Sequence, residues 1–302
     1  MHLFELDSKG NVSERELFRK EIARNIGAHS RDLRSVFSSK QLATITPRSK
    51  GIIINIHEIK LIIGAKRVMV FDIHSPEQAK QLIEVLQEKL LAAEKGSYFP
   101  FLVLETALFF AYQRLSKLHE EMDKASNRLF RKLKHELQDE SLEALLNLKK
   151  RLNKLEIAVE EIEETITETL KDDEDLQALS FNDESTARDA EIEYILEHAW
   201  ERYEDLSHRI AELSDNIDDT QEIIMLKMSN RRNAIIRFDL FISLVTAIMA
   251  AMAVVVGLFG MNLRSHLEDD PHAFYQVLGW MLAVSFAITL LVLLYLRRKK
   301  VW

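Results

Sequence analysis

The sequence predicts an α+β domain near the N-terminus, then long coiled-coil-like stalk helices, then two transmembrane helices at the C-terminus. Three features support this fold class: β-branched runs before residue 72, a charged, proline-free region with a Leu and Ile stripe, and two long apolar stretches beyond residue 237. We divide the chain into 1–96 (α+β domain), 97–237 (helical bundle and stalk), 238–259 (first span), 260–273 (external loop), 274–296 (second span) and 297–302 (basic tail).

Short runs rich in Ile and Val predict the strands of the N-terminal domain. They are bounded by polar or Gly-containing breaks, as strands in a sheet commonly are. The predicted strands are Gly51–Ile56, Leu61–Ile63 and Val68–Phe71, with Leu42–Thr46 as a further candidate.

Two helices are predicted in the same domain from signals at their starts. Ser13 and Glu16 have the spacing of a capping box, which predicts a helix over Glu14–Gly27. Pro76 suits the first turn of a helix that continues to about Glu94.

The region after Pro100 carries apolar residues at three- and four-residue spacing, with charges on the other sides. This pattern predicts long helices over 102–140 and 141–170, and another from near Ser185 to Phe259. The last would be roughly 110 Å long at 1.5 Å per residue. So long a charged helix needs partners that bury its apolar stripe, so we expect bundling; the alternative is a bundle within one chain.

Two apolar stretches are long enough to cross a bilayer, which takes about 20 residues. Residues 238–259 contain a single charge, Asp239, at their start, and residues 274–296 contain none. Buried core helices are the alternative interpretation, but two adjacent stretches of this length favour a lipid bilayer as the partner.

Basic residues predict the orientation of the spans. Arg231, Arg232 and Arg237 precede the first span, and residues 297–300 after the second are all Arg or Lys. Both termini are therefore expected on the cytoplasmic or matrix side, with the short acidic loop outside. The first 20 residues resemble neither a signal peptide nor a transit peptide. We expect a bacterial plasma membrane in preference to the mitochondrial inner membrane.

Composition excludes several classes of function. The net charge of -8 argues against a nucleic-acid partner, which requires a basic face. The absence of cysteine excludes disulfides and thiolate metal sites. We find no His cluster, Ser/His/Asp set or phosphate-binding Gly loop, so we do not expect an enzyme.

The tripeptide Gly260-Met261-Asn262 directly follows the first span. Together with other motifs it resembles the CorA family of magnesium channels, closest to the mitochondrial-type and plant-type branch. The motifs that carry the resemblance are Arg31–Arg34, Pro47–Arg48, Gly51–Lys60, Pro100–Glu105, Asp172–Asp175, Ile217–Gln221, Asn230–Asn233, Gly260–Leu263 and Leu267–Asp270. The resemblance implies a funnel-shaped homopentamer whose pore is lined by the first transmembrane helix, and Mg²⁺ as the transported ion.

The chemistry of Mg²⁺ fits this tripeptide as a selectivity filter. Mg²⁺ dehydrates reluctantly, so a ring of Asn262 carbonyl oxygens would accept hydrogen bonds from its waters and hold the hydrated ion weakly. Gly260 would permit close approach of the backbone, and Met261 would pack against neighbours. The alternative is a helix C-cap, for which Gly and Asn are also suited.

Other residues are expected along the ion path. Ser229, Arg232, Ile236 and Ser243 recur at helical spacing and are predicted to line the pore. A ring of Arg232 would limit cation flux, unless the residue anchors the membrane interface. The loop acids Glu268, Asp269 and Asp270 would concentrate cations at the mouth, or form a solvated turn.

Acidic residues of the soluble part are candidate ligands for regulatory Mg²⁺, which prefers hard oxygen donors. They are Asp172, Asp173, Glu174, Asp175, Asp218 and Asp219. A solvated acidic surface is the alternative. For the whole chain, the alternatives are a channel for Co²⁺, Ni²⁺ or Zn²⁺, and a non-conducting coiled-coil sensor or scaffold in the membrane.

Overall fold

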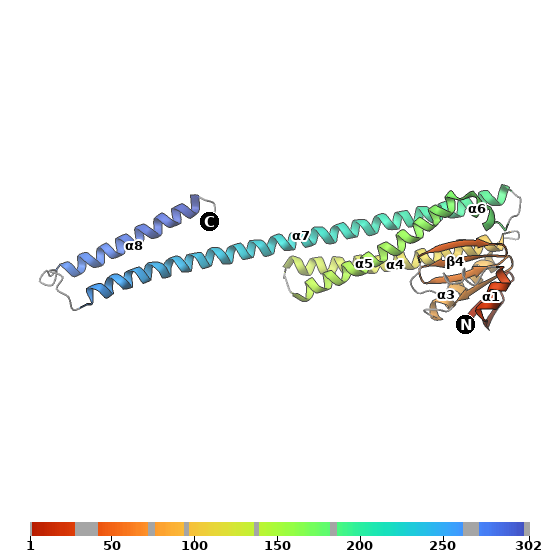
Figure 1. The fold of residues 1–302 in the computed structure, drawn as a ribbon, viewed down its shortest axis with the longest axis horizontal. Coiled ribbons are helices and arrows are strands. Elements are labelled where there is room, and N and C mark those ends of the chain that lie inside the picture. Colours follow the sequence, from red (N-terminus) through yellow and green to blue (C-terminus); the bar gives the residue numbers. More distant parts are fainter. Residues whose placement is uncertain are drawn as a thin grey trace. The chain divides into compact units, whose positions relative to one another are not determined.

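The computed structural model describes residues 2–27, 42–71, 76–93, 97–135, 139–181, 186–261 and 272–298. The chain divides into two compact units, Met1–Thr220 and Gln221–Trp302. The first contains the sheet and most of the helices, and the second contains the apolar helices (Figure 1).

A six-stranded antiparallel sheet forms the N-terminal part of the first unit, in the order β2-β1-β6-β5-β4-β3. Its strands are β1 (His2–Asp7), β2 (Val12–Glu16), β3 (Thr44–Arg48), β4 (Gly51–Ile56), β5 (Ile59–Ile63) and β6 (Arg67–Phe71). Every residue of β4 and β5 is buried, which fits their mostly apolar sequences; Asn55 and Lys60 are the buried polar exceptions. The four predicted strands are confirmed as β3 to β6, with bounds shifted by a few residues at most.

The predicted helix over Glu14–Gly27 is wrong in its first part. Residues Val12–Glu16 form β2, which pairs with β1, and α1 covers only Arg19–Ile26. The carboxylate of Glu21 accepts the N–H of Phe18 at 2.9 Å, so the capping interaction is present five residues later than predicted. In β2 the backbone N–H and C=O groups are paired with those of β1. This segment therefore does not need the hydrogen bonds of a helical turn.

Long helices make up the rest of the first unit. They are α3 (Pro76–Ala92), α4 (Phe99–His135), α5 (Asp139–Lys171), α6 (Asp173–Leu179) and the first part of α7 (Thr186–Phe259). The helix start at Pro76 and the unbroken helix to Phe259 are confirmed. In this unit α3 packs on β1, β6 and α4, and α4 packs on α5 (Figure 1).

The predicted apolar stripe of α7 is buried within the chain as far as Ile217. Of the predicted members, Ile195 is half-buried and the others are buried, namely Ile192, Leu196, Leu206, Ile210, Leu213 and Ile217. Tyr203, which was not predicted, is buried with them. The hydroxyl of Tyr203 donates to the carbonyl of Leu108 on α4 at 2.9 Å, which ties the two helices together. This part of the stripe therefore forms an intramolecular bundle, the alternative that periodicity left open.

The second unit consists of the remainder of α7 and α8 (Ala273–Arg298). Both helices contain a window long and apolar enough to cross a membrane, and 0% of each window is buried. A core helix of a soluble protein would be mostly buried, so the lipid bilayer is the environment that matches these surfaces.

Candidate functional site

The end of α7 carries the first two residues of the Gly260-Met261-Asn262 motif. The N–H of Gly260 donates to the carbonyl of Val256 at 2.9 Å, and that of Met261 to Leu258 at 3.3 Å. The helical hydrogen bonding thus continues into the motif and tightens at Met261. Asn262 lies outside the described residues, as do Glu268, Asp269 and Asp270 of the loop.

Gly260 does not adopt the left-handed conformation of the usual glycine cap. Among the glycines that the structure describes, only Gly10 and Gly27 have positive φ. A Cβ at Gly260 would lie 3.4 Å from the carbonyl oxygen of Val256, a tight but ordinary contact. Gly260 itself is exposed, and Met261 beside it is 53% exposed.

The four predicted pore-lining residues lie on one side of α7, and all are exposed. At 100° per residue, Ser229, Arg232, Ile236 and Ser243 fall within about 60° of one another. Met261 follows Ser243 by eighteen residues, which is five helical turns, so it lies on the same side. We call this side, from Ser229 to Met261, the pore-facing side, because its residues are the ones that the sequence predicts to line a pore.

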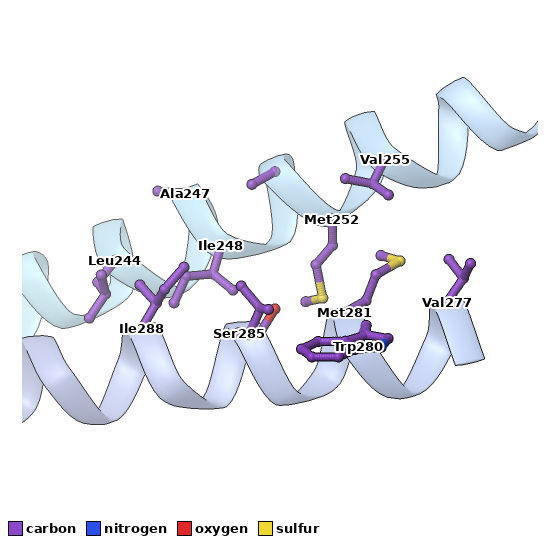
Figure 2. Close-up of a pocket in the computed structure, with 12 residues that line it drawn as sticks. Leu244, Ala247, Ile248, Met252, Val255, Val277, Trp280, Met281, Ser285 and Ile288 are labelled. Carbon is purple, nitrogen blue, oxygen red and sulfur yellow. The ribbon is translucent and has the colours of Figure 1, made fainter. Parts of the chain in front are cut away.

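The opposing helix α8 faces a different side of α7. A cavity of about 570 Å³ lies between them. Figure 2 shows Leu244, Ile248 and Met252 of α7 facing Trp280, Met281 and Ser285 of α8 across it. The residues of α7 that line this cavity are turned roughly 100° from the pore-facing side. α8 therefore leaves most of the pore-facing side uncovered.

Sequence reasoning treated Asp239 only as a charge at the start of the span. On α7 it follows Arg232 by seven residues, or about two turns, so both charges lie on nearly the same side. The signal in the sequence was the seven-residue spacing of two opposite charges. Asp239 adds an acidic group at the edge of the pore-facing side.

The first acidic group surrounds the start of α6. Asp172 is its N-cap and accepts the N–H groups of Glu174 at 3.0 Å and Asp175 at 3.3 Å. Burial raises the pKa of Asp175, and repulsion from Asp172 and Glu174 adds to this, whereas Arg48 opposes it. One carboxylate is thus used in capping, while its neighbours keep an excess of negative charge.

The second acidic group lies far away along the helices. Asp218 of α7 forms an ion pair with Lys149 of α5, and Asp219 is exposed. Lys149 precedes Asp172 by twenty-three residues, which corresponds to about 35 Å of helix. The two groups are therefore separate in one chain. Within the described ranges, no three His, Asp or Glu side chains are grouped to hold a metal ion.

A third acidic group was not predicted. Burial raises the pKa of Glu163 on α5, and repulsion from Glu204 and Glu160 adds to this effect, while His208 opposes it. The signal in the sequence would have been the charged residues that stand next to the buried Leu and Ile residues of α5 and α7.

Comparison with known proteins gives a consistent result. Residues 3–232 match the family model described as "Magnesium transporter MRS2-like". The chain is similar to "Magnesium transporter MRS2-11, chloroplastic" of Arabidopsis thaliana, with 26% identity over 99% of this chain and 71% of that protein. It is also similar to the "Mitochondrial inner membrane magnesium transporter mrs2" of Schizosaccharomyces pombe, with 29% identity over 99% of this chain and 75% of that protein.

Solved structures show the same fold. The complete CorA magnesium transporter of Methanocaldococcus jannaschii matches with a TM-score of 0.72 and 14% identity, over 96% of this chain and 97% of that one. The full-length CmaX protein matches with a TM-score of 0.53 and 13% identity, over 96% of each chain. The predicted α+β domain, long helices and two C-terminal apolar helices are thus confirmed as the fold class.

Proposed function

This chain belongs to the MRS2-like family of magnesium transporters, and we propose that it conducts Mg²⁺ through a pore lined by α7 and selects the hydrated ion at Gly260, Met261 and Asn262. The observation that carries the proposal is the continuous exposed side of α7, which runs from Ser229 to Met261 and leads straight into the motif. A single helix cannot enclose a water-filled path. Several copies of α7 would have to surround the path, each with this side turned toward it.

The selectivity step follows from the hydration of Mg²⁺. The ion keeps its waters in a tight octahedron, so neutral oxygens that accept hydrogen bonds from those waters recognise it without dehydrating it. Asn262 would supply these oxygens, and the exposed backbone at Gly260 would add its carbonyl. Glu268, Asp269 and Asp270 would raise the local concentration of cations at the outer mouth.

Assembly into a homo-oligomer is supported by the apolar surface of α7 just before the span. Ile223, Met225, Leu226 and Met228 are each more than half exposed in the single chain. At 100° per residue they point to different sides of the helix, so this exposed apolar segment indicates contact with more than one neighbour. We propose a funnel-shaped homopentamer, the assembly that the resemblance to the CorA family implies.

Regulation by Mg²⁺ on the inner side is the second element of the proposal. Asp172, Asp173, Glu174 and Asp175 lie about 35 Å from Asp218 and Asp219 in one chain, so each group would need ligands from a neighbouring subunit. Mg²⁺ bound between subunits would neutralise the repulsion among these carboxylates and favour the closed state.

The membrane topology follows from charge. We place both termini on the cytoplasmic or matrix side because basic residues flank both spans there. The relatives named above belong to the mitochondrial inner membrane and the chloroplast. The bacterial plasma membrane therefore stays a prediction for this chain.

Ion flux into proteoliposomes tests the proposal against both alternatives. We expect Mg²⁺ uptake by the wild type and its loss in Asn262→Ala, with Ser285→Ala as the control because Ser285 lines the cavity between α7 and α8. Undiminished Mg²⁺ flux in Asn262→Ala would contradict the filter. Faster flux of Co²⁺, Ni²⁺ or Zn²⁺ than of Mg²⁺ would favour another ion, and absence of flux in the wild type would favour a scaffold.

A further inference from the structure

A cavity of about 320 Å³ lies on the sheet of the first unit, and its lining includes none of the residues assigned to the ion path or to the acidic groups. Its basic rim comes from three places in the sequence: Arg15 of β2, Lys50 of the β3–β4 turn, and Lys66 and Arg67 at the β5–β6 turn. Four cations thus surround one cavity of a chain whose net charge is -8. This basic cavity has no part in the proposed transport mechanism.

The sheet register explains why these residues meet. Leu3 of β1 lies directly opposite Arg15 of β2, and Glu5 of β1 lies directly opposite Met69 of β6. Residues opposite one another share a face, as do residues two apart along a strand. Arg15, Glu5 and Met69 therefore project from the same face of the sheet.

The turns that carry the other cations are held in place. The N–H of Gly64 donates to the carbonyl of Arg67 at 2.8 Å, and the N–H of Ser8 donates to that of Lys66 at 2.9 Å. A Cβ at Gly27 would lie 2.7 Å from the Oγ of Ser49, so the β3–β4 turn packs tightly against the end of α1. The backbone beneath the rim is thus preorganised for a ligand.

A single carboxylate orients the two guanidinium groups. Glu5 is 8% exposed, and its two oxygens lie 3.0 Å from Nε of Arg15 and 3.1 Å from a terminal nitrogen of Arg67. Both arginine side chains remain more than half exposed, at 53% and 59%. Each has five N–H donors, so each keeps donors for a ligand after it has bound Glu5.

We propose that the basic cavity binds a nucleoside triphosphate. The four rim cations and Glu5 give a net charge of +3, which suits a triphosphate chain, and guanidinium groups bind phosphate oxygens through paired hydrogen bonds. Leu17 and Met69 supply apolar lining for a base, and the volume is at the lower end of the range for small-molecule sites. The proposal goes beyond magnesium transport and does not depend on it.

Calorimetric titration of the purified full-length protein with ATP tests this proposal. The buffer contains EDTA, because bound Mg²⁺ would neutralise part of the phosphate charge. We expect saturable binding at one site per chain, and a Kd at least about tenfold higher in the double variant Lys50→Ala, Lys66→Ala, which loses two charge-assisted contacts. The matched control is Lys80→Ala, Lys132→Ala, which removes two exposed lysines elsewhere in the first unit and should leave the Kd within about twofold.

Inorganic triphosphate is the second probe and tests the apolar part of the cavity. It should bind about tenfold more weakly than ATP because it has no base to cover Leu17 and Met69. Leu17→Gln should narrow this difference without changing the melting temperature by more than a few degrees. Absence of saturable binding, equal losses in the two double lysine variants, or equal affinity for ATP and inorganic triphosphate would each overturn the proposal.

Discussion

Lys149 of α5 and Asp218 of α7 form an ion pair that joins two helices of the first unit. The pair is partly open to solvent, since 50% of the Asp218 side chain and 31% of that of Lys149 are exposed. Asp218 is a proposed ligand for regulatory Mg²⁺, so in a single chain its charge is already compensated by an ammonium group. An incoming Mg²⁺ ion must therefore compete with Lys149.

Replacing Lys149 should make inhibition by Mg²⁺ more sensitive. A partly exposed ion pair contributes roughly 0.2–1 kcal/mol, so Lys149→Met should lower the Mg²⁺ concentration for half-closure by a factor of about 1.4 to 5. The measurement is flux or current as a function of Mg²⁺ on the inner side. Lys150→Met removes an exposed neighbouring charge and serves as the control. Equal Mg²⁺ dependence of the two variants would count against Asp218 as a regulatory ligand.

Removing Arg232 should increase conductance several-fold. Arg232 lies on the pore-facing side, where a ring of positive charge opposes the passage of a divalent cation. Single-channel current through Arg232→Ser, compared with wild type, measures this effect. Arg231→Ser is the matched control, because that residue is turned about 100° away on the helix. Unchanged current in Arg232→Ser, or an equal rise in both variants, would disprove a pore position for Arg232.

Asp239 should then oppose the effect of Arg232. It is the acidic residue two turns further along nearly the same side. Asp239→Asn should therefore reduce Mg²⁺ current in the same recordings, and the double variant with Arg232→Ser should recover part of it. A double variant no more conducting than Asp239→Asn alone would show that the two charges do not act on the same ion.

Glu163→Gln should alter the pH dependence of stability. Because burial and nearby acids raise the pKa of Glu163 in the folded state, the folded protein binds more protons than the unfolded one above the ordinary pKa of 4.5. This contribution to stability is complete below pH 4.5 and is lost as pH rises through the raised folded-state pKa. The variant should melt at a higher temperature than wild type at pH 7–8 and at the same temperature near pH 4.

The control for that prediction is Glu164→Gln, the exposed neighbour on α5. Its melting temperature should follow that of the wild type at every pH. If the stability of Glu163→Gln relative to wild type did not increase between pH 4 and pH 8, the ionisation of Glu163 beside Glu204 and Glu160 would have no cost in stability. The prediction would then be wrong.

Tyr203→Phe should destabilise the first unit. Burial raises the pKa of Tyr203, so its hydroxyl keeps its proton and donates to the carbonyl of Leu108. Loss of this buried hydrogen bond should cost about 0.5–1.5 kcal/mol of unfolding free energy, measured by denaturant titration. Tyr194→Phe, at a side chain that is 68% exposed, should have no measurable effect. Equal stability of the two variants would mean that the hydroxyl contributes nothing to the packing of α7 on α4.

Features that depend on local periodicity were predictable from the residues. The unbroken α7, the two spans, strands β3 to β6 and the helical spacing of Ser229, Arg232, Ile236 and Ser243 all follow from patterns within a few turns or residues. Pairings distant in sequence were not predictable in this way. Strand β1 was not predicted. The capping box at Ser13 wrongly predicted a helix, because the strand that pairs with this segment lies outside the local pattern.

The sequence by itself determined the family motif, the membrane spans and the side of α7 on which the predicted pore residues fall, because these depend on residue type and on the fixed geometry of a helix. Only the tertiary structure decided which charges meet. Packing of α5 against α7 places Lys149 on Asp218 and keeps Asp172 about 35 Å away, and the register of β1 with β2 and β6 brings Arg15 and Arg67 to Glu5. Such contacts depend on how whole elements pack, and no pattern within one element encodes them.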